Sequence, residues 1–333
     1  MLTEHEWTER FEAQQEVVTR LKQAIQQVII GQEEVIDQVL IAMLAGGHAL
    51  LEGIPGLGKT LLVRTIAESL DLSFSRIQFT PDLMPADIVG TQMISTDETG
   101  ATAFRFQAGP IFGNLVLADE INRATPKTQS ALLEAMQEHT VTVAGETRLL
   151  PQPFFVLATQ NPLEMEGTYV LPEAQLDRFL LKMIVEFPSE AELKQIVLQT
   201  TTPHRAERGP IATGERLREM QATVREILIA DELVEEAVRL LLMTHPTNEA
   251  ATEQVKRYVR AGAGPRGAQA LVQTAKARAF LKGRYHVSRE DLIVVAPAVF
   301  RHRVLRNFEA EAVGVTADDI VGEILDKLKE TTR

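Results

Sequence analysis

The stretch HALLEGIPGLGKTLL, residues 48–62, decides the fold. Its apolar start, His48–Glu52, predicts a short buried strand, and Leu61–Leu70 predicts a helix. Between them, Gly53–Thr60 matches the phosphate-loop pattern G-x-x-x-x-G-K-T without a mismatch. Glycines allow successive backbone N–H groups to converge on phosphate oxygens, and the following helix directs its positive end to the same place. The stretch therefore predicts a nucleotide-binding α/β core.

The residue types of this loop point to a nucleoside triphosphate with Mg²⁺. Lys59 is suited to reach the β and γ phosphates, while the hydroxyl of Thr60 is a ligand for the metal ion. The alternative is a glycine-rich turn without a ligand, but a chance match in a chain of this length is on the order of one per cent. We expect the following residues to contact the nucleotide: Gly53, Pro55, Gly56, Leu57, Gly58, Lys59, Thr60 and Leu61.

Two acidic residues end a second apolar run, Leu115–Asp119. A pair of acids in this place is often only a solvated strand end. Downstream of a phosphate loop, however, it supplies the two carboxylates that hydrolysis requires. Asp119 is predicted to hold Mg²⁺, directly or through water. Glu120 is predicted to polarise the attacking water, an effect worth roughly 10²–10⁴ in rate for a positioned base.

Further apolar runs alternate with helical patterns and extend the α/β prediction. A parallel sheet covered on both faces follows from this alternation. The amide of Asn161 follows one of these runs, so we expect it at the same carboxyl edge as Asp119. The additional expected strands are Ser73–Phe79, Phe154–Thr159 and Lys182–Phe187, and the expected helices of this half include one ending at Gly31, one from Glu33 to Gly46, and Lys127–Glu138.

After Pro188 the strand signal largely disappears, which predicts a second, helical domain. We expect an α/β core over residues 1–188 and a helical lid over residues 189–333. Ser288 with Asp291, and Thr316 with Asp319, have the spacing of capping boxes. The expected helices of the lid are Ser189–Gln199, Asp231–Thr244, Arg266–Leu281, Ser288–Arg301 and Thr316–Lys329.

Composition excludes several classes of protein. The chain has 333 residues, 34 Lys and Arg against 46 Asp and Glu, and a formal net charge of −12, which argues against a dedicated nucleic-acid binder. It has no cysteine, so disulfides and thiolate metal sites are excluded. No apolar run approaches the roughly 18 residues of a spanning helix, and the acidic amino terminus lacks a signal-peptide core. We expect a cytoplasmic protein without a membrane span.

The order of these motifs resembles the AAA+ ATPases and, within them, the MoxR family of the helix-2-insert clade. The resemblance extends from about Val28 to about Ile324, nearly the whole chain, and no core motif is missing. The stretches that carry it are Ile30-Gly31-Gln32, Leu51-Glu52-Gly53, Asp119-Glu120-Ile121-Asn122-Arg123-Ala124, Ala158-Thr159-Gln160-Asn161-Pro162, Leu176-Asp177-Arg178-Phe179 and Gly264-Pro265-Arg266.

This resemblance implies roles for residues that the motifs alone do not explain. Asn161 is then sensor 1, Arg178 the arginine finger and Arg266 sensor 2, while Gly31 and Gln32 lie by the adenine. The alternative for Arg178 is a surface salt bridge with Asp177. For Arg266 it is an exposed residue at a helix start, where a cation is disfavoured unless it meets an anion. Arg123 either reaches a neighbouring subunit or braces the loop after Asp119.

Two predicted hairpins indicate what the energy of hydrolysis is used for. Residues 88–108 form a helix-2 insert with its tip near residues 97–100, and residues 140–150 form a second hairpin before sensor 1. Both are surface loops unless, as the resemblance implies, they face a ring pore. The first tip lacks the aromatic–hydrophobic pair of a peptide-threading unfoldase, which favours remodelling of a partner.

The resemblance implies a homohexameric ring that acts as a chaperone-like activator of another protein or metalloenzyme complex. MoxR relatives typically work with proteins that carry a von Willebrand factor A domain. The alternative is a nucleic-acid motor of the same clade, which the low net basicity and the scarcity of cations at the hairpin tips disfavour. An ATP-gated scaffold would require a damaged catalytic set, whereas Glu120 and Arg178 are both present.

Overall fold

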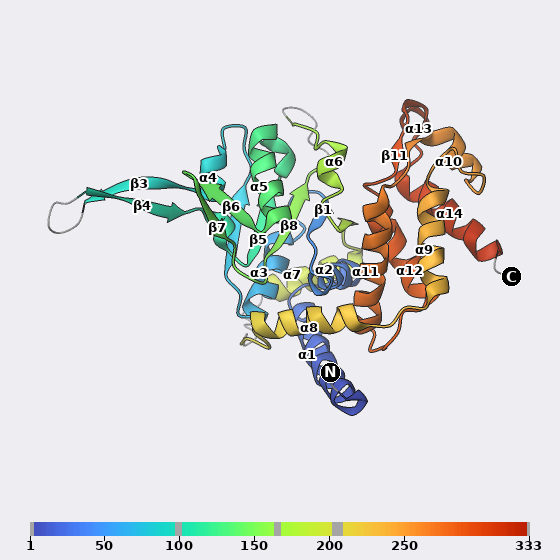
Figure 1. Ribbon diagram of the computed structural model, residues 1–333, viewed down its shortest axis with the longest axis horizontal. Helices are drawn as coiled ribbons and strands as arrows, with labels where there is room; N and C mark the ends of the chain where they lie inside the picture. The colour runs from blue at the N-terminus through green and yellow to red at the C-terminus, as the bar shows by residue number, and fades with distance from the viewer. Residues whose placement is uncertain (1–2, 97–101, 163–167, 202–208, 332–333) are drawn as a thin grey trace.

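The computed structural model describes residues 3–96, 102–162, 168–201 and 209–331. A five-stranded sheet with the strand order β2-β5-β8-β1-β9 forms its centre (Figure 1). All neighbouring strands in this sheet pair in parallel, which confirms the predicted α/β fold. The strands are β1 (Ala49–Glu52), β2 (Phe74–Gln78), β5 (Leu115–Asp119), β8 (Phe155–Gln160) and β9 (Leu181–Ile184).

Alternation along the strands divides the core between the two faces of the sheet. In β5, Leu115 and Leu117 belong to one buried cluster, whereas Val116 and Ala118 belong to the other. The second cluster includes Leu132, Leu133 and Met136 of α5 (Pro126–Glu138), the helix that covers this face. The first cluster is covered by α1 (Glu4–Gln26), α2 (Glu33–Leu44) and α3 (Lys59–Ser69).

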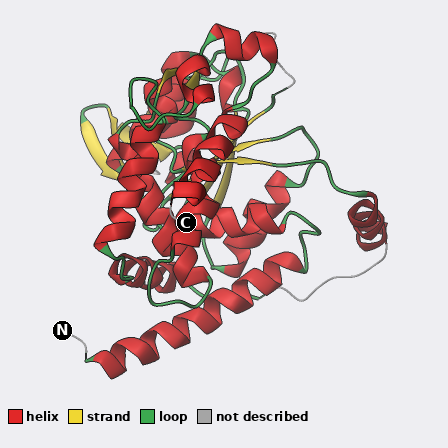
Figure 2. Ribbon diagram, turned by 90° about the vertical axis from the view of Figure 1, so that its right-hand side faces the viewer, coloured by secondary structure: helices red, strands yellow, loops and turns green. Residues whose placement is uncertain are grey.

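The amino-terminal helix α1 ends earlier than expected (Figure 2). It begins with a capping box in which Thr3 and Glu6 exchange side-chain and backbone hydrogen bonds. It ends at Gln26, so the predicted end at Gly31 was wrong. Val28 continues the apolar spacing of the helix, but it packs against the core from the turn that follows the helix.

The second half of the chain is helical, as predicted. A small antiparallel pair, β10 (Val259–Ala261) with β11 (Leu305–Arg306), was not expected, and neither were α8, α10 and α13. Polar residues dominate α8, where only four side chains are buried, and the other two helices span six residues each. The helices are α7 (Glu190–Thr201), α8 (Gly214–Glu226), α9 (Asp231–Met243), α10 (Glu253–Tyr258), α11 (Pro265–Leu281), α12 (Arg289–Phe300), α13 (Phe308–Val313) and α14 (Ala317–Thr331).

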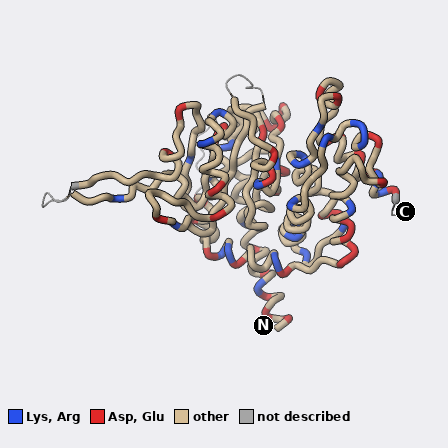
Figure 3. The backbone as a smooth tube through the Cα atoms, turned by 45° about the horizontal axis from the view of Figure 1, so that its top comes forward, with Lys and Arg blue, Asp and Glu red and all other residues tan. Residues whose placement is uncertain are grey.

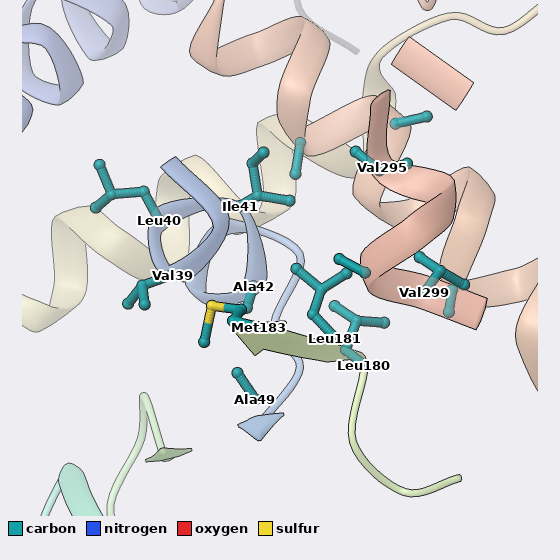
Figure 4. Packing of buried hydrophobic residues seen from close by; sticks show 14 of the residues in the cluster. Val39, Leu40, Ile41, Ala42, Ala49, Leu180, Leu181, Met183, Val295 and Val299 are labelled. Carbon is teal, nitrogen blue, oxygen red and sulfur yellow. The ribbon is translucent and has the colours of Figure 1, made fainter. Parts of the chain in front are cut away.

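The lid helices and the sheet share one continuous hydrophobic cluster. Figure 4 shows Val39–Ala42 of α2 beside Leu181 and Met183 of β9, with Val295 and Val299 of α12 packed next to them. Burial of such side chains stabilises by about 1.5–3 kcal/mol each, so this contact fixes where the lid sits. The division into domains at Pro188 stays a prediction.

Both expected hairpins are present. β3 (Gly90–Thr96) pairs with β4 (Thr102–Ala108), although the expected tip lies outside the described residues. β6 (Thr140–Val143) pairs with β7 (Glu146–Leu149) across Ala144 and Gly145, both of which have the positive φ of a tight hairpin turn. The remaining short elements are α4 (Pro85–Val89), η1 (Pro110–Phe112), η2 (Ile121–Arg123) and α6 (Glu173–Leu176).

The last strand of the sheet is shorter than expected. β9 ends at Ile184 rather than at Phe187, because its last pairing partner is Glu52, where β1 turns into the phosphate loop. Phe187 is instead 66% exposed. In the described part of the chain, every helix is too short or too polar to cross a bilayer.

Candidate active site

The predicted phosphate loop connects the carboxyl end of β1 to the start of α3. Gly56 (φ +86°) and Gly58 (φ +77°) adopt left-handed conformations that favour glycine, and a Cβ added at either position would meet no atom within 4 Å. The loop is therefore open on this side. Gly58 occupies the N-cap position of α3, so the first N–H groups of this helix are free of a capping side chain. Such groups attract phosphate oxygens.

Lys59 is folded back onto its own loop. Its Nζ donates a hydrogen bond to the carbonyl oxygen of Gly53 at 2.6 Å. Partial burial lowers the pKa of Lys59, while the charges of Asp119 and Glu120 oppose this shift. The ammonium group therefore lies near both predicted carboxylates, in a position from which it can exchange the carbonyl for a phosphate.

Asp119, the last residue of β5, is held from two sides. Its Oδ1 accepts a hydrogen bond from the hydroxyl of Thr159 at 2.6 Å. Its Oδ2 accepts from Nη2 and Nε of Arg76 at 2.6 and 3.2 Å. The side chain is only 14% exposed, and it lies on β5, an interior strand between β2 and β8. Oxygen donors are what Mg²⁺ prefers, so this group fits the predicted metal site.

The side chain of Glu120 contacts strand β2 and the short helix η2. The backbone of Glu120 is left-handed (φ +57°), and its N–H donates to the hydroxyl of Thr159 at 2.9 Å. The side-chain Oε2 accepts hydrogen bonds from Nε2 of Gln78 at 2.8 Å and from Nη1 of Arg123 at 3.0 Å. Arg123 therefore contacts the residue that follows Asp119 within its own chain, and its role toward a neighbouring subunit stays open.

Asn161 lies where the sequence places it. It follows β8, which is the strand between β5 and β1, and its side chain is buried with 6% exposure. Because the strands are parallel, the phosphate loop, Asp119 and Asn161 all occupy the carboxyl edge of the sheet. The structure thus brings the phosphate loop, Asp119 and Asn161 together at this edge.

Gly31 and Gln32 lie next to the phosphate loop. The Nε2 of Gln32 donates to the carbonyl oxygen of Leu57 at 3.0 Å, and the carboxylate of Glu192 lies against Gly31. A cavity of about 300 Å³ opens beside them, lined in part by Ile30 and Phe187. The lining also includes several carboxylates, among them Glu33, Glu34 and Glu186, and the place of Gly31 and Gln32 by the adenine stays a prediction.

Arg178 and Arg266 occupy the opposite edge of the sheet. Both line a cavity of about 230 Å³ together with His48 and Leu180. His48 directly precedes β1, and Leu180 directly precedes β9, so this cavity is at the amino ends of the parallel strands. The two arginines are therefore brought together with each other, but away from the phosphate loop of their own chain.

The lid holds the segment that carries Arg178. Arg303 donates to the carbonyl oxygens of Phe179 (2.7 Å) and Leu180 (3.2 Å) and to the carboxylate of Asp177 (2.8 Å). His302 also contacts the carbonyl oxygen of Phe179, at 3.0 Å. Burial lowers the pKa of Arg303, and the neighbouring charge of Arg266 acts in the same direction.

Sequence reasoning missed the residues that hold the catalytic carboxylates. The sequence contained one signal, since Arg76 and Gln78 flank Ile77 on an expected strand and so share one face. Thr159 and Arg303 contact residues 40 and 126 positions away, and their sequence surroundings do not indicate these partners. The residues that hold Asp119 or Glu120 are Arg76, Gln78 and Thr159, whereas Arg303 holds the segment that carries Arg178.

Comparison with known proteins is consistent with this site. The model of the ATPase family associated with various cellular activities (AAA) matches residues 48–181, and an AAA lid domain model matches residues 251–324. The chain is 41% identical over 302 residues to Chaperone MoxR1 of Mycobacterium tuberculosis, a match that covers 90% of this chain and 79% of the relative. It is 30% identical over 305 residues to Protein MoxR of Methylorubrum extorquens, covering 87% and 88%.

A solved structure has the same fold. The crystal structure of a provisionally assigned ATPase from Cytophaga hutchinsonii superposes with a TM-score of 0.89 at 39% identity and covers 96% of both chains. At this coverage, the similarity includes both the core and the lid. This chain therefore belongs to the MoxR family of AAA+ ATPases.

Proposed function

We propose that this protein hydrolyses ATP in a Mg²⁺-dependent reaction. The observation that supports this most strongly is the convergence of Lys59, Asp119, Glu120 and Asn161 at the carboxyl edge of the sheet, beside an open phosphate loop. Thr60 and Asp119 are the residues suited to hold the metal ion. When bound, Mg²⁺ neutralises charge on the phosphate oxygens.

Residues of the chain carry out the remaining steps of the proposed reaction. Lys59 leaves the carbonyl oxygen of Gly53 and pairs with the phosphates. Asn161 orients the water molecule, and Glu120 accepts its proton as the water oxygen bonds to the γ-phosphorus. The bond from this phosphorus to the bridging oxygen breaks, which yields ADP and phosphate. To reach the water molecule, Glu120 must leave its contacts with Gln78 and Arg123.

We further propose that the active form is a homohexameric ring. Arg178 and Arg266 lie at the opposite edge from the phosphate loop, which supports a head-to-tail arrangement in which each subunit offers both cations to the next subunit's ATP. A guanidinium there stabilises charge on the transferring phosphoryl group, an effect worth about 10³–10⁵ in rate.

The ring is proposed to act as a chaperone-like activator of another protein, with a von Willebrand factor A domain protein as the partner. Two relatives carry the names Chaperone MoxR1 and Protein MoxR, which supports this role over a nucleic-acid motor. The described arms of hairpin β3–β4 carry a single charged residue, Arg105, and are almost without blue in Figure 3. A surface with so few cations is unsuited to a phosphate backbone.

Two variants test the assignment of hydrolysis. Lys59→Ala is expected to abolish ATP binding, because it removes the cation that neutralises phosphate charge. Glu120→Gln is expected to keep binding and to lower turnover by roughly 10²–10⁴, since an amide does not accept the proton. Calorimetry measures binding, and phosphate release measures turnover. Equal loss of ATP affinity in both variants would contradict these roles.

A further inference from the structure

The carboxylate assigned to the metal ion is already paired with an arginine. Arg76 and Asp119 lie on adjacent strands β2 and β5, and alternation places them on the same face of the sheet as α3. Two N–H groups of Arg76 donate to Oδ2 of Asp119, at 2.6 and 3.2 Å. We propose that Arg76 is a positioning residue that holds Asp119 while no metal is bound and competes with the divalent cation for this carboxylate.

The contacts of Asp119 with Thr159 and with Arg76 differ in how easily they break. Thr159 donates to Oδ1 and simultaneously accepts the backbone N–H of Glu120, and its side chain is fully buried, so this contact is fixed. Arg76 is 47% exposed and extends from the edge strand of the sheet. A divalent cation that approaches Oδ2 repels the guanidinium, which can move into solvent. The contact to Arg76 is therefore the one that metal binding breaks.

The displacement of Arg76 reaches Glu120 through one intermediate residue. Nη2 of Arg76 also donates to Oε1 of Gln78 at 2.7 Å, and Nε2 of Gln78 donates to Oε2 of Glu120 at 2.8 Å. Once Arg76 departs, Gln78 loses the hydrogen bond that orients its amide. Its hold on Glu120 weakens at the moment when Asp119 takes up the metal ion. Arg76 thus links occupation of the metal site to a weaker contact between Gln78 and Glu120, while Arg123 still donates to that carboxylate.

This inference rests on the proposed ATPase function, and its test measures metal dependence of binding rather than turnover. The full-length protein is titrated by calorimetry with adenylyl imidodiphosphate, first in EDTA and then in excess Mg²⁺. The ratio of the two dissociation constants reports how much the metal ion strengthens nucleotide binding. Arg76→Met retains the aliphatic stem and removes the donors.

We expect Arg76→Met to increase this ratio about tenfold. This is the low end of the effect of a charge-assisted hydrogen bond, and it applies here because the arginine is half-exposed. Arg76→Lys retains one cationic donor and is expected to produce a smaller increase. The matched control is Arg64→Met. Arg64 belongs to α3, and its guanidinium lies over the ring of Phe74, which is in the same strand as Arg76. The ratio for Arg64→Met should equal that of the wild type.

An unchanged or lower ratio in Arg76→Met, with nucleotide binding intact, overturns the role of Arg76 and leaves the proposed ATPase function in place. The same increase in Arg64→Met also overturns it, because the effect then reflects general charge. If Arg76→Met fails to fold, Arg76→Lys decides by the same criterion. A wild-type protein that binds no nucleotide in either buffer overturns the proposed function itself.

Discussion

Arg178 lies before β9, at the edge of the sheet opposite the phosphate loop of its own chain. The four residues of β1 alone separate the two edges by about 13 Å. Arg178 is therefore expected to act on the ATP of a neighbouring subunit. Arg178→Ala should bind ATP as the wild type does, while its turnover should fall by about 10³-fold or more.

Mixing two inactive variants makes this prediction quantitative. A working site requires Glu120 from the subunit that binds ATP and Arg178 from the next subunit. When Glu120→Gln and Arg178→Ala subunits are mixed in equal amounts, half of the subunits have Glu120 and half of their neighbours have Arg178. About one quarter of the sites are then complete in a head-to-tail ring, whatever its size. Phosphate release should recover to about a quarter of the wild-type rate if the sites act independently.

The controls make the mixing experiment decisive. Arg216→Ala removes a surface arginine paired with Glu219, and it should leave activity unchanged. Mass spectrometry establishes that the rings are mixed. Absence of recovery in mixed rings would refute the assignment in trans, and so would full activity from a dilute sample shown to be monomeric.

Two further predictions concern stability. Burial lowers the pKa of His48 to about 4. In the unfolded chain this imidazole binds a proton near pH 6.5, whereas in the folded chain it stays neutral until about pH 4. The free energy of unfolding should therefore decrease by about 3 kcal/mol as the pH falls from 6.5 to 4. Urea unfolding should show this loss in the wild type and a shallower one in His48→Asn. Arg303→Met removes the N–H groups that donate to Asp177 and to the carbonyl oxygens of Phe179 and Leu180, and it should lower the free energy of unfolding by about 3 kcal/mol in urea titrations. A loss no larger than that in Arg257→Met, which breaks a surface pair with Glu309, would contradict that prediction.

Much of the fold could be predicted because its signals are local. The apolar run, the glycines and the Lys-Thr pair of residues 48–62 determine a strand, a loop and a helix within a few turns of chain. Parallel pairing then follows from the alternation of strands with helices. The prediction failed where packing decides the ends of elements, as at Gln26 and Ile184, or where a polar pattern is nevertheless helical, as in α8.

Local patterns were sufficient to predict the chemical groups of the site: a phosphate loop with Lys59, and two acids that follow a buried strand. The residues that restrain these groups could be identified only from the folded chain. Arg76 contacts Asp119 across 43 residues of chain, and Arg303 contacts Asp177 across 126. The tertiary structure also places Arg178 at the opposite edge of the sheet from the phosphate loop. A local pattern specifies what a side chain is able to do, but its partner is set by how strands and helices pack, because packing joins residues that are distant in the chain.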